Sequence, residues 1–186
     1  MKALKTLWNV VTTVLVMAVV ILAILLVGVR VVGLTPYVVL SGSMEPTYHT
    51  GSLIYVKKVD PFTIESGTPI TFMMDEDTIA THRVVQVVPD ETDASVVRFQ
   101  TKGDANDAID GSLVHYKNVI GTPIFSIPYL GFVSNYITNP PGMYIGFTVL
   151  GLIILMLFAP DLLKAADAAD KKDAEKKQKG SHEADR

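Results

Sequence analysis

Hydrophobic and polar residues form three blocks along the chain. From Thr6 to Val29 there is no charged residue, and most positions are Val, Leu, Ile, Ala or Met. A second apolar run extends from Met143 to Ala159. A bilayer core requires about 20 apolar residues in a helix, and neither run has the polar face that a soluble core helix shows. The pattern therefore predicts transmembrane helices over residues 7–29 and 143–159.

The first apolar run has a rival interpretation as a cleaved signal peptide. The hydrophobic part of such a peptide is only about 7–15 residues long, and this run is clearly longer. Gly28-Val29-Arg30 also lacks the small-x-small pattern of a cleavage site. The run is therefore interpreted as an uncleaved signal anchor.

Lysines lie before the first run and after the second run. Cytoplasmic flanks of membrane spans carry an excess of Lys and Arg, so both chain ends are predicted in the cytoplasm. Residues 1–6 would then be a short cytoplasmic N-terminus, and residues 160–186 a charged, partly disordered cytoplasmic tail. Residues 30–142 would face the outside of the cell membrane.

The block between the apolar runs has little helical periodicity. It contains short β-branched runs bounded by Gly, Pro, Ser and Asp, which is typical of strands and turns. These runs are residues 36–40, 52–56, 69–72, 78–81, 83–88, 96–100, 119–121 and 124–127. We therefore predict a mainly β fold: a compact antiparallel β domain over residues 30–142, between two transmembrane helices.

Composition narrows the function classes. Residues 30–142 carry seven basic and twelve acidic side chains, a net charge of −5, without a cluster of Lys or Arg. Nucleic-acid binding is therefore disfavoured. The chain has no cysteine, which excludes disulfides, thiolate zinc sites and a cysteine nucleophile.

The middle block contains the groups required for serine-based chemistry. A serine hydroxyl needs a base to take its proton, histidine is a natural base near neutral pH, and a carboxylate can orient that histidine. The candidates are Ser43, the histidines 49, 82 and 115, and the aspartates 104, 107 and 110; His182 lies in the tail. Spacing alone does not select among them, since a turn around Ser43 and a surface histidine explain the same residues.

Three motifs resemble those of type I signal peptidases. Ser41-Gly42-Ser43-Met44-Glu45-Pro46-Thr47 is similar to the nucleophile motif, and Thr81-His82-Arg83-Val84-Val85 resembles the base region. Thr101-Lys102-Gly103-Asp104-Ala105-Asn106, with Asp110 beyond it, resembles the acidic box. The matching branch occurs in archaea, the endoplasmic reticulum and some Gram-positive bacteria, and has His where the main bacterial branch has Lys. The motifs follow the family order within residues 38–131.

The resemblance implies a role for each motif residue. Ser43 would be the nucleophile and His82 the general base. Asp110 matches the triad aspartate and Asp104 a second acidic position, and either of them could contact His82. The Ser43 backbone N–H and the Ser41 hydroxyl would form the oxyanion hole. The mechanism requires no metal or organic cofactor, and a calcium loop at residues 103–107 lacks the full ligand pattern.

The resemblance also implies an activity and its partners. It predicts a membrane-bound serine endopeptidase that removes signal peptides from exported preproteins after a small-x-small motif, either generally or for a dedicated few. The lipid bilayer and the protein-export machinery would be its other partners. One alternative is a non-catalytic, membrane-tethered β module for binding or assembly. Another is a Ser–Lys dyad, for which Lys57 and Lys58 are available although they match no family motif. His49 and His115 match no family base.

Overall fold

The computed structural model describes residues 2–184 except 91–92 and 94–95. Residues 22–142 form one compact unit, and the two ends of the chain form another. The first unit contains the β domain that the sequence predicts.

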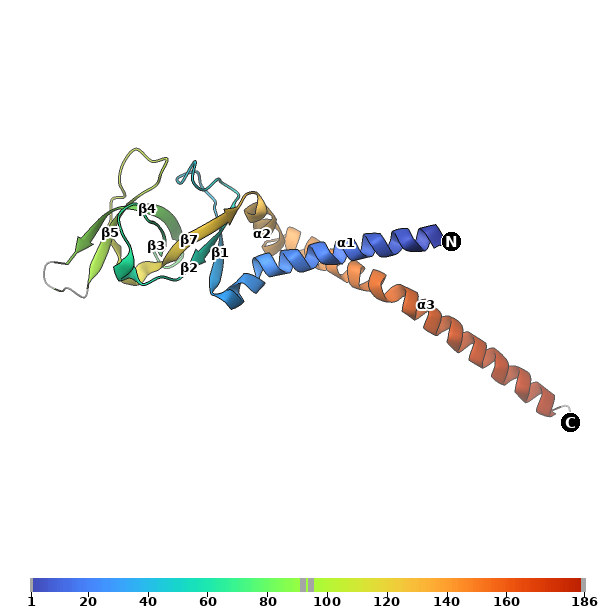
Figure 1. The fold of residues 1–186 in the computed structure, drawn as a ribbon. Coiled ribbons are helices and arrows are strands. Elements are labelled where there is room, and N and C mark those ends of the chain that lie inside the picture. The colour runs from blue at the N-terminus through green and yellow to red at the C-terminus, as the bar shows by residue number, and fades with distance from the viewer. Residues whose placement is uncertain (1, 91–92, 94–95, 185–186) are drawn as a thin grey trace. The chain divides into compact units, whose positions relative to one another are not determined.

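A seven-stranded sheet builds the first unit (Figure 1). Its strands are β1 (Leu34–Val38), β2 (Leu53–Lys57), β3 (Pro69–Met73), β4 (Ile79–Pro89), β5 (Val97–Lys102), β6 (Val114–His115) and β7 (Val119–Ile127). The order across the sheet is β1-β2-β7-β3-β4-β5-β6, and all neighbours are antiparallel. A short helix, α2 (Leu130–Thr138), follows β7. The predicted antiparallel β domain is therefore confirmed.

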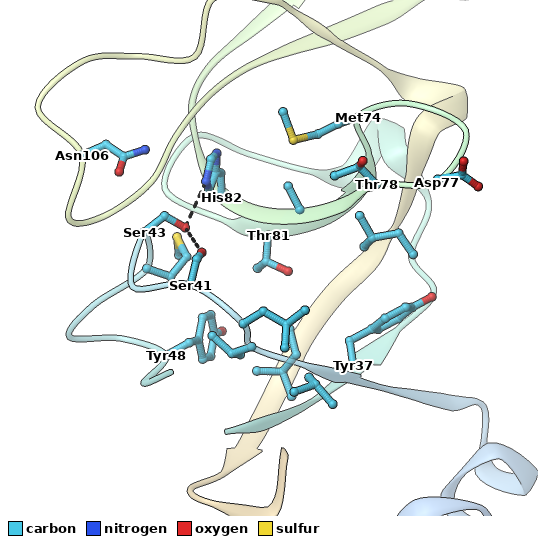
Figure 2. A pocket seen from close by; sticks show the side chains of 17 residues that line it. Tyr37, Ser41, Ser43, Tyr48, Met74, Asp77, Thr78, Thr81, His82 and Asn106 are labelled. Atoms are coloured by element: carbon cyan, nitrogen blue, oxygen red, sulfur yellow. Dashed lines mark hydrogen bonds between the residues drawn. The ribbon is translucent and has the colours of Figure 1, made fainter. Parts of the chain in front are cut away.

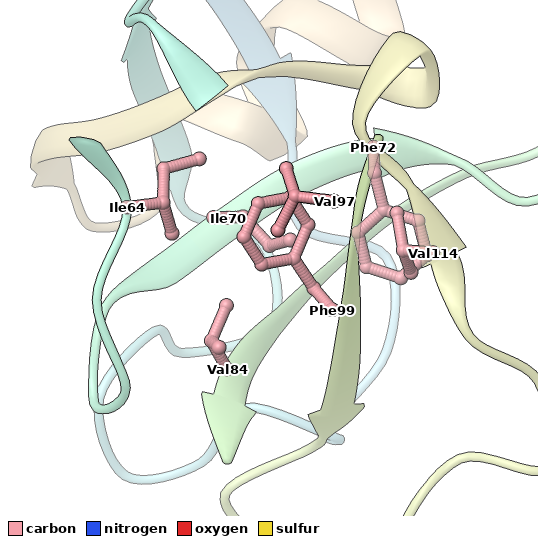
Figure 3. Packing of buried hydrophobic residues seen from close by; sticks show 7 residues of the cluster. All are labelled: Ile64, Ile70, Phe72, Val84, Val97, Phe99 and Val114. Atoms are coloured by element: carbon pink, nitrogen blue, oxygen red, sulfur yellow. The ribbon is translucent and has the colours of Figure 1, made fainter. Parts of the chain in front are cut away.

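The main hydrophobic core lies on one face of β3, β4, β5 and β6 (Figure 3). Burial alternates along β5, where Val97, Phe99 and Thr101 are buried and the residues between them are half-buried. This period of two follows from the pleat, which directs successive side chains to opposite faces. The cluster consists of Ile64, Ile70, Phe72, Val84, Val97, Phe99 and Val114.

Strand β2, next to the edge strand β1, has a separate set of buried contacts. Tyr55 is fully buried, and its ring stacks on Phe125 of β7 with the ring centroids 4.4 Å apart. Its hydroxyl donates to the Leu25 carbonyl at 3.0 Å. Burying a tyrosine requires a partner for its hydroxyl, and this bond fixes the last turn of α1 (Lys2–Leu26) to the sheet.

The apolar runs form α1 (Lys2–Leu26) and the first part of α3 (Gly142–Ala184). Residues Thr6–Leu26 and Gly142–Ala159 are long and apolar enough to cross a bilayer, with mean hydropathies of 2.8 and 2.3. The two apolar helices are confirmed, with α1 ending three residues before the predicted boundary at residue 29. The description "mainly β" holds only for the first unit, because α3 alone has 43 residues.

Candidate active site

A cleft of about 590 Å³ opens in the first unit, and residues from each of the three motifs line it (Figure 2). One wall is the segment 37–41, which comprises the end of β1 and the residues after it. The other wall is the segment 77–82, which comprises two residues before β4 and the start of that strand, residues 79–82. Ser43, His82 and Asn106 lie together along the cleft. The fold thus brings together motifs that are distant in sequence.

Ser43, His82 and Asp110 form a continuous line of contacts. His82 Nδ1 lies 2.6 Å from Asp110 Oδ2, and His82 Nε2 lies 3.3 Å from Ser43 Oγ. A carboxylate accepts hydrogen bonds, so Nδ1 donates and Nε2 presents its lone pair to the serine hydroxyl. The His82 side chain is only 12% exposed. The arrangement can therefore take a proton from Ser43.

Asp110 is held in place by β5. The Thr101 hydroxyl donates to Asp110 Oδ2 at 2.6 Å, and the Asp110 backbone N–H donates to the Thr101 carbonyl at 2.8 Å. Gln100 Nε2 donates to the Asp110 carbonyl at 2.6 Å. These bonds explain why Thr101, a polar residue, is fully buried at the end of a core strand. Sequence reasoning assigned Thr101 no role, although its polarity at an inward position was a usable signal.

The Ser41 hydroxyl lies beside the candidate nucleophile. Its oxygen is 3.2 Å from Ser43 Oγ. When the Ser43 hydroxyl donates to His82, Ser41 must donate to Ser43, because each hydroxyl carries a single proton. Ser41 thus presents a donor directly beside Ser43 Oγ. Its role in an oxyanion hole stays a prediction.

Asp104 contacts Arg83 rather than His82. The Arg83 guanidinium donates to both carboxylate oxygens, at 2.8 and 2.6 Å, and the Thr47 hydroxyl donates to Oδ2 at 2.5 Å. These hydrogen bonds, chiefly those from Arg83, hold the pKa of Asp104 below the ordinary value of 3.8 against the opposing effect of burial. The carboxylate therefore stays ionised at neutral pH. It ties the loop that carries Ser43 to strand β4.

Two adjacent residues of β4, His82 and Arg83, thus bind two different carboxylates. Successive side chains of a strand point to opposite faces, so His82 and Arg83 cannot share one partner. The loop after β5 supplies Asp104 to Arg83 and Asp110 to His82. The geometry therefore resolves which acid contacts His82, a choice that the sequence left open.

Gly103 allows this loop to approach the nucleophile closely. A Cβ atom there would lie 2.6 Å from the Ser43 carbonyl oxygen and 2.7 Å from Asn106 Nδ2. Real Cβ atoms essentially never come so close, so only glycine fits without a shift. The Ala105 backbone N–H donates to the same Ser43 carbonyl at 2.9 Å, which fixes the loop against the nucleophile segment.

The remaining candidates from the sequence lie elsewhere. His49 is bound to Glu45 at 2.5 Å and is 62% exposed, and His115 Nδ1 accepts from the Lys117 backbone. Neither His49 nor His115 lines the cleft, and neither do Lys57, Lys58, Lys102 or Asp107. Within the described residues, no group of three or more His, Cys, Asp or Glu side chains is arranged to hold a metal ion.

The site has the arrangement of a serine hydrolase: a serine hydroxyl contacts an imidazole, and the imidazole contacts a carboxylate. The comparison with known proteins narrows that class. Residues 11–124 match the family "Signal peptidase, peptidase S26", and the chain belongs to this family. The resemblance noted in the three motifs is thereby confirmed. Together with the two exposed apolar helices, membership makes the chain a membrane protein.

Individual relatives cover part of the chain. "Signal peptidase I W" of Bacillus subtilis is 46% identical over 90 residues, which are 48% of this chain and 46% of the relative. "Signal peptidase complex catalytic subunit SEC11C" of Homo sapiens is 33% identical over 128 residues, or 64% of this chain and 66% of the relative. The chain therefore spans about half the length of the first relative and about two thirds of the second. Both the bacterial and the endoplasmic-reticulum relative agree with the branch that the motifs resemble.

Proposed function

We propose that this chain is a membrane-bound serine endopeptidase that removes N-terminal signal peptides from exported preproteins. The observation that carries the proposal is the line of contacts from Asp110 through His82 to Ser43, which ends in an open cleft. Membership of the signal peptidase family supports the same activity.

The proposed mechanism follows from the contacts. Ser43 Oγ attacks the scissile carbonyl while His82 Nε2 takes its proton, and Asp110 stabilises the resulting imidazolium. The Ser43 backbone N–H and the Ser41 hydroxyl bind the oxyanion, each worth about 2.7–4 kcal/mol of transition-state stabilisation. His82 then gives the proton to the leaving amine. A water molecule, activated by the same histidine, releases the signal peptide from Ser43.

The cleft suits an extended peptide. Strand β1 is the edge of the sheet, and β5 pairs with β4 only from Arg83 onward. Segment 37–41 of one wall and the strand part of the other, residues 79–82, therefore offer backbone groups that no other strand occupies. A substrate could pair with either wall by strand addition. Residues one and three of that strand would share a face, which fits selection of a small-x-small pattern by two shallow pockets.

The apolar helices supply the membrane context of the proposal. We infer that residues 7–29 and 143–159 span the cell membrane, with residues 30–142 outside and residues 1–6 and 160–186 in the cytoplasm. A preprotein held by its own apolar segment shares the bilayer with the enzyme, which raises their effective concentration. The human relative is named as a subunit of a complex. The protein-export machinery is the corresponding partner proposed here.

Cleavage of a preprotein tests the proposed activity. The full chain in detergent is expected to cut a preprotein directly after its small-x-small motif, and mass spectrometry of the mature product locates the bond. A preparation carrying Ser43→Ala controls for contaminating peptidases and should leave the preprotein intact. A wild-type chain that binds the preprotein without cutting it would contradict the activity and favour a non-catalytic β module.

Labelling of lysines tests the proposed orientation. An amine reagent that cannot cross membranes is expected to modify Lys57 and Lys117, both exposed in the β domain, in intact cells. Lys171 should react only after permeabilisation, because the positive-inside rule places it in the cytoplasm. Peptide mass spectrometry identifies the labelled sites. The reverse labelling pattern would show the opposite orientation.

A further inference from the structure

Asn106 is a polar residue of the cleft that takes no part in the proposed proton transfers or in the oxyanion hole. It lies in the loop after β5 and lines the cleft with Ser43 and His82. Figure 2 shows it beyond these two residues, on the side away from Thr81 and Tyr37, with its amide nitrogen directed toward His82. Within the part of the chain that the structure describes, its side chain has no hydrogen-bond partner. An amide next to the nucleophile is therefore available to a ligand.

The loop holds this amide in a defined position. The Asn106 backbone N–H donates to the Gly103 carbonyl at 3.0 Å, which closes a tight turn. The side-chain nitrogen lies only 2.7 Å from the point where a Cβ atom at position 103 would stand, so it is close to Gly103. The Ser43 carbonyl borders the same point. The turn thus places the amide beside the nucleophile segment before any substrate arrives, which lowers the entropic cost of using it.

The chemistry at His82 identifies which part of a substrate reaches Asn106. His82 Nε2 must give its proton to the leaving amine, so that amine has to lie within hydrogen-bond reach of the imidazole. The segments 37–41 and 79–82 on one side of Ser43 can hold the residues before the scissile bond. The residue after that bond, which begins with the leaving amine, must then extend toward the opposite side, where Asn106 lies.

We propose that Asn106 is a substrate-binding residue that donates a hydrogen bond to the main-chain carbonyl of the first residue after the scissile bond. The inference rests on the proposed peptidase function and adds a contact on the product side of the bond. A main-chain contact does not depend on the side chain of that residue. It would therefore align the leaving segment of preproteins whose mature sequences begin with different amino acids.

Two matched substrates test this contact with the full-length chain in detergent. One is a signal-peptide segment that continues for several residues beyond the scissile bond. The other ends at the scissile carbonyl as a methyl ester, so it has no residue for Asn106 to bind. Asn106→Ala is expected to lower kcat/KM about tenfold on the peptide, the effect of one lost hydrogen bond, and to leave the ester unchanged. Asp107→Ala, an exposed neighbour outside the cleft, should leave both unchanged.

The outcomes separate this proposal from the underlying function. Equal losses on peptide and ester would overturn it, because they would place Asn106 at the oxyanion or in a purely structural role. Unchanged rates on both substrates would overturn it as well. Failure of the wild-type chain to cut the peptide at all would instead refute the peptidase function itself.

Discussion

Replacement of His82 by Ala is expected to lower kcat/KM for preprotein cleavage by about 10⁴-fold or more. Without the imidazole, no group accepts the Ser43 proton or returns a proton to the leaving amine. His82 is held by Asp110 at the edge of the cleft and does not belong to the hydrophobic cluster of the domain. The variant should therefore remain folded, which circular dichroism and thermal unfolding can check beside the cleavage assay.

Lysine variants provide the matched controls for this prediction. A Ser–Lys dyad would use Lys57 or Lys58, but Lys57 ends strand β2 and neither residue lines the cleft. Lys57→Ala and Lys58→Ala are therefore expected to retain activity close to that of the wild type. Cleavage that survives in His82→Ala and is lost in either lysine variant would contradict the histidine mechanism and support the dyad.

Most strands could be predicted because their apolar runs are bounded by turn residues. Strand β6 was missed, since two residues are too few to produce an alternating pattern. Strands β4 and β7 are single strands in the structure, although each was predicted as two runs. The break predicted in β7 includes Pro123, which cannot donate to a sheet ladder. The structure shows why proline is tolerated there: β7 pairs with β3 up to Gly121 and with β2 beyond it. Pro123 therefore has a strand neighbour on one side only.

The sequence predicted which motifs form the candidate site, but not which side chains contact one another within it. The sequence placed Ser43, His82 and both aspartates in motifs, but it could not pair them. That pairing depends on which face of β4 each side chain occupies and on how the loop after β5 folds back. The contributions of Thr101 to Asp110 and of Thr47 to Asp104 also depend on contacts across about ten and sixty residues of chain. No local pattern carries such information.

Replacement of Asp110 by Asn should reduce kcat/KM about 10³- to 10⁴-fold with the fold retained. The amide has no negative charge to stabilise the imidazolium, and when its NH₂ group faces Nδ1 it holds the histidine in the wrong tautomer. Thr101 donates to the same carboxylate oxygen as His82, so the amide also disturbs that bond. The cleavage rate, compared with wild type at equal folded concentration, measures the effect.

Asp104→Asn is the matched control, because it makes the same chemical change six residues away. Asp104 contacts Arg83 and Thr47 but neither reacting group, so its loss should act through the position of the Ser43 loop. We expect destabilisation of about 1.5–3 kcal/mol, the usual contribution of hydrogen bonds to charged groups, and a much smaller fall in kcat/KM than in Asp110→Asn. If a folded Asp104→Asn variant lost all cleavage while Asp110→Asn stayed active, the two aspartates would have exchanged roles. The contact between His82 and Asp110 would then be catalytically irrelevant.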